Sequence, residues 1–182
     1  KNGADIILGN HAHVPEPMEM KTVTLDDGTN REGFVIYSMG NFFSAQTDNY
    51  TRDTLILNVE VRKDGKTGKI TIDKATYTPV YVYDNGQNAK DRYELLDVEQ
   101  VIKDYESGST KYSESMYNLM KSELKKIEEI VGPEIDNTKK EKEEENNQEG
   151  ELGKLKDNII IGESNLVRFS FKMRKIKELK AA

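Results

Sequence analysis

The stretch GADIILGNHAHV, residues 3–14, joins a short apolar run to a glycine and then to two histidines. The run from Ala4 to Leu8 consists mostly of branched apolar residues and is closed by Gly9, a pattern typical of a short buried strand. In open α/β architectures, ligands bind beyond the carboxyl ends of the strands. The stretch therefore predicts a strand that leads directly into a ligand-binding loop.

His11 and His13 are the only histidines in the 182 residues of the chain. Neutral imidazole is a common ligand of Zn, Mn and Fe. Gly9 permits the backbone bend that lets both histidines turn inward. A surface or packing role is the alternative for a single His-x-His pattern. Because metal centres usually need three or four ligands, we expect His11 and His13 to supply half of a metal site at most.

A second stretch, FVIYSMGNF at residues 34–42, repeats the order of a strand followed by a polar loop. The strand over residues 33–38 runs into Gly40 and Asn41, so Asn41 is expected at the same end of the sheet as the histidines. There its amide would hydrogen-bond a ligand or orient a metal-binding side chain. The alternative is a turn asparagine that bonds its own backbone. Asn41 is thus the third candidate site residue, whereas Phe42 and Phe43 are expected in the core.

The two stretches together resemble the two signatures of CapA-type bacterial capsule (poly-γ-glutamate) synthesis proteins. These signatures are Gly-Ala-Asp-strand-Gly-x-His-Pro-His-Val and, about twenty residues later, Tyr-Ser-Leu-Gly-Asn-Phe. The resemblance covers roughly residues 2–81. Ala12 replaces the usual proline, and Glu16 stands near a position where the family often has glutamine. Glu16 is interpreted as a solvated loop residue rather than an extra acidic ligand.

The resemblance implies a fold related to calcineurin-like metallophosphoesterases, which are four-layer α/β/β/α sandwiches with a dinuclear metal centre. It places His11 and His13 on one metal ion each, with a bridging water as nucleophile. The implied cofactors are divalent Mn, Zn or Fe ions, two in a full-length protein. The other ligands of that family (Asp, His, Asp and Asn) lie on N-terminal motifs that are absent from this sequence. We therefore expect the C-terminal part of a longer protein.

Hydrophobic periodicity predicts the remaining elements. Alternation indicates strands at residues 18–25, 53–62 and 69–83, and Pro79 is expected to break the last strand or place it at a sheet edge. Leu55, Leu57, Val59 and Val61 fall on one face of the second strand. The period then changes and predicts two helices, the first over residues 95–105.

The second helix is expected to start at Ser109 or Ser113 and to run through Val131, where Gly132 and Pro133 stop it. The charge run at residues 138–151 indicates a disordered linker. Short strands are expected at residues 158–162 and 166–171, and a basic, weakly helical end follows at residues 173–179.

These elements predict an α+β or α/β fold in four parts. Residues 1–83 would form the C-terminal half of a metallophosphoesterase-like domain, and residues 84–132 a helical extension. Residues 133–154 would form the linker, and residues 155–182 a C-terminal segment.

Composition excludes several classes of function. The net charge of −6 and the pI near 5.2 argue against nonspecific nucleic-acid binding. The absence of cysteine excludes disulfides and thiolate metal sites. No apolar run reaches membrane-spanning length. The resemblance implies a place on the extracellular face of the cell membrane, anchored through an N-terminal segment that this sequence does not contain.

Three functions remain open. The first is a metal-dependent hydrolase acting on a phosphorylated substrate or on the anionic capsule polymer. The second is a non-catalytic scaffold subunit that joins membrane proteins of capsule synthesis or export. The third is an α+β binding module in which the histidines are incidental. Tight direct binding of an anionic polymer by so acidic a chain would need a metal ion or a local basic patch.

Overall fold

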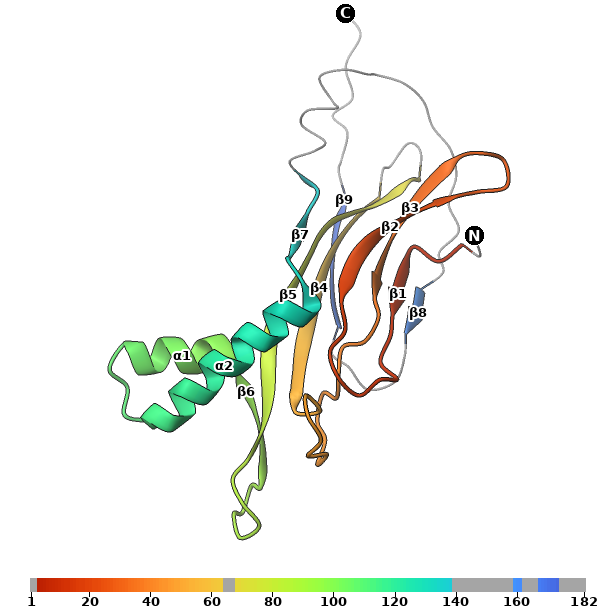
Figure 1. Ribbon diagram of the computed structural model, residues 1–182. Helices are drawn as coiled ribbons and strands as arrows, with labels where there is room; N and C mark the ends of the chain where they lie inside the picture. Colours follow the sequence, from red (N-terminus) through yellow and green to blue (C-terminus); the bar gives the residue numbers. More distant parts are fainter. Residues whose placement is uncertain (1–2, 64–67, 139–158, 162–166, 174–182) are drawn as a thin grey trace, which may run out of the picture.

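The computed structural model describes residues 3–63, 68–138, 159–161 and 167–173, and these form an α+β fold of two sheets and two helices (Figure 1). The predicted helical end after Met173 and all but the first residue of the predicted linker at 138–151 lie outside the described residues. The α/β/β/α order of four layers stays a prediction.

The first sheet carries the two sequence signatures. Its strands are β1 (Ile6–Leu8), β2 (Met18–Thr24), β3 (Asn30–Ile36) and β8 (Ile159–Ile161). Their order across the sheet is β2-β3-β1-β8, and β1 runs parallel to both of its neighbours. Because β1 and β3 are parallel, the loops that follow them leave the sheet at the same edge.

The second sheet is built on a long antiparallel pair. Its strands are β4 (Asp53–Lys63), β5 (Ile70–Asp84), β6 (Tyr93–Asp97), β7 (Ile135–Asp136) and β9 (Val167–Met173). The order is β6-β5-β4-β9, with β7 pairing with another part of β5. The strands predicted at residues 158–162 and 166–171 are confirmed as β8 and β9.

Pro79 does not break β5, contrary to one of the two outcomes expected for it. It pairs with Leu55 of β4. On its other side, β5 pairs with β6 from Val80 onward and with β7 up to Ala75. Pro79 lies between these two paired parts. Proline has no N–H to donate, so it is tolerated at such an edge position.

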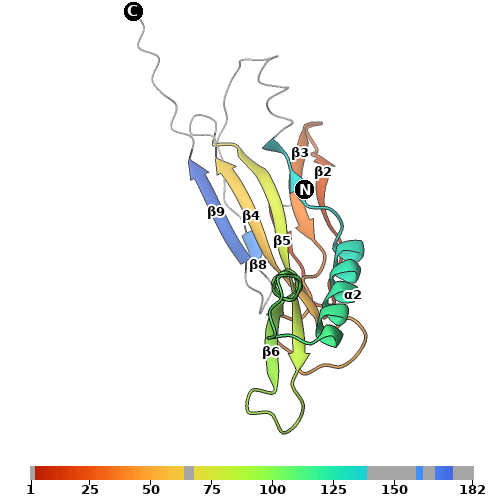
Figure 2. The same ribbon diagram turned by 90° about the vertical axis from the view of Figure 1, so that its left-hand side faces the viewer.

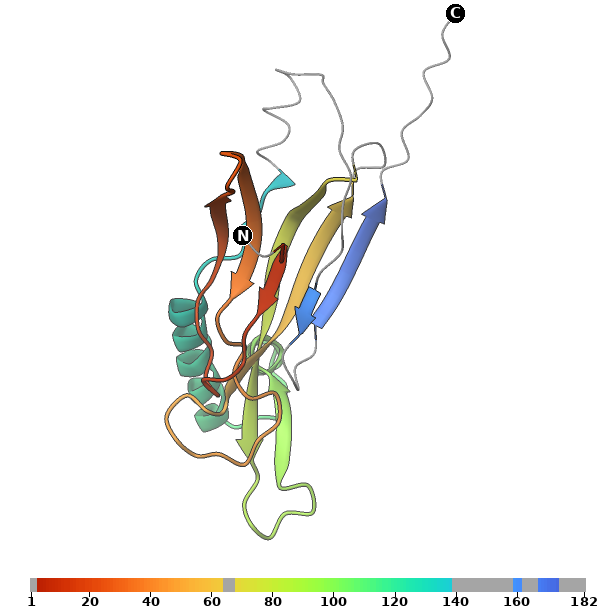
Figure 3. The ribbon, with the colours of Figure 1, turned by 90° about the vertical axis from the view of Figure 1, so that its right-hand side faces the viewer.

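The core lies between the two sheets, which face each other in Figure 3. The predicted apolar face of β4 is confirmed, because each of its four residues is at most 4% exposed. These side chains belong to the same buried cluster as Ile6 and Leu8 of β1 and Phe34 and Ile36 of β3.

The first helix starts later than the sequence predicts. Leu95 and Leu96 are in β6, where they pair with Val82 and Tyr81, and α1 spans Val98–Glu106. The side chain of Asp97 accepts a hydrogen bond from the backbone N–H of Gln100 and so caps the helix. The prediction was wrong here because two consecutive apolar residues suit a strand paired on one side as well as a helix.

The second helix, α2, spans Glu114–Val131. Ser113, one of the two predicted starts, is its N-cap, and Gly132 follows its last turn as predicted. Met120 packs in a smaller cluster with α1, whereas Ile127 and Val131 join the main core. In Figure 1 the helix pair projects to one side, and the C-terminal end of α2 returns to the sheets; Figure 2 shows α2 beside β5. Neither of the described helices is long and apolar enough to cross a membrane.

Candidate functional site

The end of β1 is fixed by Gly9. Its N–H donates to the carbonyl of Ile36 at 2.8 Å, which continues the contact between β1 and β3 beyond the strand. A Cβ atom built at this position would lie 1.8 Å from the carbonyl oxygen of Tyr37. Only glycine therefore allows the histidine loop to start so close to the end of β3.

The histidine loop is bound to the segment that follows β3. The N–H of Met39 donates to the carbonyl of Gly9 at 3.2 Å, and the N–H of Glu16 donates to the carbonyl of Ser38 at 2.9 Å. Within the loop His13 has a φ of 62°, which is uncommon for a residue other than glycine. His11 and His13 are both exposed, and their ring centroids are 6.2 Å apart.

Gly40 brings Asn41 to the same place. Its φ is 76°, and a Cβ atom there would lie 2.6 Å from the carbonyl oxygen of Asp53. The backbone can therefore turn sharply against β4 only with glycine at this position. The next side chain, that of Asn41, lies beside His13, so the expectation that both occupy one end of the sheet is confirmed.

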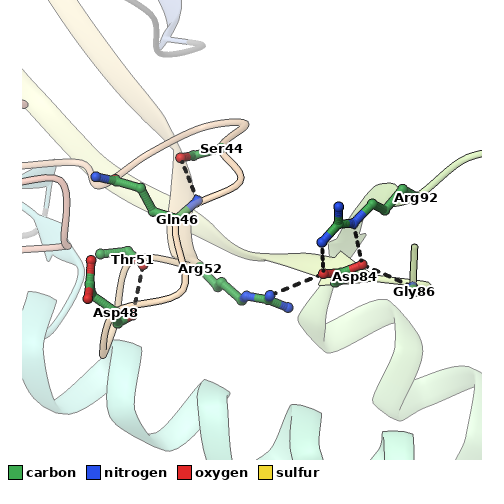
Figure 4. Close-up of polar contacts among 8 residues, drawn as sticks. All are labelled: Ser44, Gln46, Asp48, Thr51, Arg52, Asp84, Gly86 and Arg92. Atoms are coloured by element: carbon green, nitrogen blue, oxygen red, sulfur yellow. Dashed lines mark hydrogen bonds and ion pairs between the residues drawn. The ribbon is translucent and has the colours of Figure 1, made fainter.

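The side chain of Asn41 is held by three partners rather than by its own turn. Its Nδ2 donates to the carbonyl of Thr51 at 3.3 Å and to Oε1 of Gln46 at 2.5 Å. Its Oδ1 lies 2.8 Å from Nδ1 of His13. Thr51 is itself fixed, because its hydroxyl donates to the carbonyl of Asp48 at 2.7 Å (Figure 4).

These contacts determine which nitrogen of His13 carries the proton. The carbonyl of Thr51 can only accept, so the Asn41 atom facing it must be the amide nitrogen. The atom facing His13 is then the amide oxygen, which also can only accept. His13 must donate from Nδ1, and in the neutral ring Nε2 keeps its lone pair for a ligand. This is the arrangement in which a partner group orients a metal-binding histidine.

The described residues complete no metal site by themselves. Among them there is no group of three or more His, Cys, Asp or Glu side chains arranged to hold a metal ion, so Glu16 does not supply a third ligand beside the histidines. Two exposed imidazoles, one with an oriented Nε2, fit half of a metal-binding donor set and no more. Phe43, expected in the core, is instead 60% exposed, and its ring forms a T-shaped contact with the ring of Tyr93.

Sequence patterns missed the supports of Asn41 and a pair of buried acids. Gln46 and Thr51 lie in an irregular loop that has no period to detect. Asp53 and Glu123 are only 2% and 6% exposed. Burial and the neighbouring Glu123 carboxylate raise the pKa of Asp53 to about 7. The available signal was the position of Glu123, because it lies on the apolar side of α2 between Met120 and Ile127.

The part of the chain that carries the candidate site residues is similar to known proteins. Residues 1–46 match the family model described as bacterial capsule synthesis protein PGA_cap. These residues include His11, His13 and Asn41. This part of the chain is similar to bacterial capsule synthesis proteins. This similarity agrees with the resemblance carried by the two signatures, which meet at one sheet edge in the structure.

A named relative supports the CapA type. The chain is 39% identical over 83 residues to a protein of Bacillus subtilis (strain 168) named "PGA biosynthesis protein CapA", and the match covers 43% of this chain. The chain spans about a fifth of the length of this relative, since the match covers 19% of it. No solved structure matches the chain.

Proposed function

We propose that this CapA-type chain supplies the His-x-His half of a metallophosphoesterase-like metal site and that the complete protein is a metal-dependent hydrolase in capsule polymer synthesis. The observation that carries the proposal is the contact between His13 Nδ1 and Asn41 Oδ1 at 2.8 Å. This contact joins the two signature loops. Asn41 fixes the orientation of the His13 ring, and Nε2 stays available for a metal ion, as metal-binding histidines require.

In this proposal His11 and His13 would hold divalent Mn, Zn or Fe ions. Their ring centroids lie 6.2 Å apart, so both imidazoles would be close enough to contribute to one metal centre. When bound, such ions supply Lewis-acid activation of a phosphoryl or carbonyl group and an activated water. The further ligands would come from outside the described residues, as part of a four-layer sandwich.

This chain's own contribution would be positioning. Asn41 holds the imidazole of His13, and the loop that contains Gln46 and Thr51 holds Asn41. Gly9 and Gly40 let both loops lie against the sheet edge. The substrate would be a phosphorylated compound or the anionic polymer, and a metal ion would offset the repulsion expected from a chain of net charge −6.

The proposed setting is the cell surface, where a capsule is assembled. The partners would be membrane proteins of capsule synthesis, and the complete protein would be anchored at the extracellular face of the membrane.

A non-catalytic scaffold is the second candidate. It requires no ligands beyond the described residues, which contain no group of three or more potential metal ligands of the His, Cys, Asp and Glu types. In that case α1 and α2 would serve as a docking surface, and polymer formation would survive loss of both histidines.

The two candidates are separated in a full-length protein that contains this chain. We expect the double variant His11→Ala, His13→Ala to abolish Mn-dependent hydrolysis of a model phosphodiester and polymer formation in cells. Asn41→Ala should lower metal affinity by about 10- to 100-fold, because it frees the ring of His13. Thr22→Ala, at an exposed position of β2, serves as the control. Normal hydrolysis and normal polymer formation in the folded double variant would contradict the hydrolase proposal.

A further inference from the structure

A polar cavity of about 380 Å³ lies between the loop before β4, strand β5 and helix α2. Charged side chains dominate its lining, among them Asp48, Arg52, Asp53, Glu123 and Lys126. All of these residues lie outside residues 1–46, the part of the chain that matches the capsule-synthesis family model. The volume is within the range of pockets that hold small molecules.

Asp53 is the most deeply buried charged group in this lining. It is 2% exposed, and its Oδ1 atom has no hydrogen-bond donor within reach among the residues that the structure describes. The nearby Glu123 is 6% exposed, and both of its oxygens accept from Lys126 Nζ at 2.8 and 2.9 Å. A buried carboxylate oxygen without a donor costs free energy, so the carboxylate of Asp53, which lines the cavity, is an acceptor group suited to a bound N–H group.

The cavity lining also carries positive charge. Arg52 lies 3.4 Å from Asp84, and Arg92 contacts the same carboxylate at 3.1 and 3.2 Å. Figure 4 shows the two guanidinium groups approaching Asp84 from two sides. Two guanidinium groups share one carboxylate, so this trio has an excess of one positive charge, and Arg52, the more weakly held of the two, lines the cavity.

We propose that this cavity binds the ammonium and carboxylate groups of a small α-amino acid, with the ammonium group at Asp53 and the carboxylate at Arg52. A simple anion would face Asp48, Asp53 and Glu123, and a simple amine would face Arg52 and Lys126. A zwitterion instead places each charge next to its opposite. The inference rests on the cavity and does not depend on the metal site.

The test is isothermal titration of the purified chain at about pH 8, where Asp53 is ionised, with a set of probes that differ by one charged group. D- and L-norvaline carry both groups, pentanoate lacks the ammonium group, and butylamine lacks the carboxylate. We expect saturable binding of at least one norvaline enantiomer and weaker binding, by about tenfold or more, of the other two probes, since each loses a charge-assisted hydrogen bond.

Two variants and two controls locate the binding. Asp53→Asn should keep the fold, because its amide can donate to Glu123, and should weaken norvaline binding by about tenfold or more. Arg52→Gln should weaken it similarly and provides a second test if Asp53→Asn does not fold. Glu129→Gln, an exposed change on α2, should leave binding unchanged. The double variant His11→Ala, His13→Ala should also bind norvaline normally, which separates this inference from the proposed function.

Three results would overturn the inference. The first is the absence of saturable norvaline binding at millimolar concentration. The second is binding of pentanoate or butylamine as tight as that of norvaline. The third is unchanged norvaline binding by folded Asp53→Asn and Arg52→Gln variants.

Discussion

His13 is oriented by a residue that is 28 positions away in the sequence. Asn41 accepts from Nδ1 of the ring and is held in turn by Gln46 and Thr51. Both His13 and Asn41 could be predicted, because each follows a strand and each belongs to a recognisable signature. The supports of Asn41 could not, because the contacts of an irregular loop depend on its three-dimensional path rather than on any residue spacing.

Asp53 and Glu123 make stability depend on pH. The pKa of Asp53 is raised from 3.8 to about 7 by burial and by the Glu123 carboxylate, while Lys126 opposes the shift. The folded protein thus keeps a proton that the unfolded chain has lost between these values. The contribution of Asp53 to stability is therefore full below about pH 4 and is lost as the pH rises to about 7.

We expect Asp53→Asn to be more stable than the parent chain at about pH 8, because its neutral amide can still donate to Glu123. The difference should shrink towards about pH 5, where Asp53 is protonated in the parent. Urea unfolding at both pH values measures this. Glu129→Gln, an exposed change on helix α2, which also carries Glu123, should show no such pH dependence. An equal difference for Asp53→Asn at both pH values would contradict the assignment.

At the scale of elements, strand β1 and helix α2 have the largest consequences. The parallel pairing of β1 with β3 brings the two signature loops to one edge. Gly132 predicted the end of α2, and of the two predicted starts, Ser109 and Ser113, the structure has Ser113 as the N-cap. The apolar stripe did not predict which of the two hydrophobic clusters each part of the helix packs in. That depends on the direction in which the helix leaves the preceding loop, which local patterns do not encode.

The C-terminal turns of α2 are expected to be part of the main core. Ile127 is fully buried in the cluster that joins both sheets. Ile127→Ala should therefore lower the free energy of unfolding by about 2–4 kcal/mol through lost contacts and a cavity. Lys125→Ala, an exposed change two residues earlier, should cost less than about 0.5 kcal/mol. Denaturant unfolding followed by circular dichroism measures both, and equal effects would contradict the packing of α2 on the sheets.

At the scale of the whole molecule, distant segments complete both sheets. β8 pairs with β1, and β9 pairs with β4, across more than a hundred residues of chain. Periodicity predicted strands near residues 158–162 and 166–171. No local sequence pattern, however, identifies the strand with which each of them pairs. The α+β class was therefore predictable from the sequence, whereas the sheet order had to come from the structure.

The central claim is that His11 and His13 form half of a metal site. Because the chain has only two histidines, ¹⁵N labelling of histidine gives NMR signals from these two rings alone. We predict that in the metal-free chain His13 is the Nδ1–H tautomer, and that Zn²⁺ shifts Nε2 of His13 and a ring nitrogen of His11 while Nδ1 of His13 stays protonated. Zn²⁺ titration that leaves both rings unchanged, or that shifts them equally in Asn41→Ala and in the parent chain, would contradict the account.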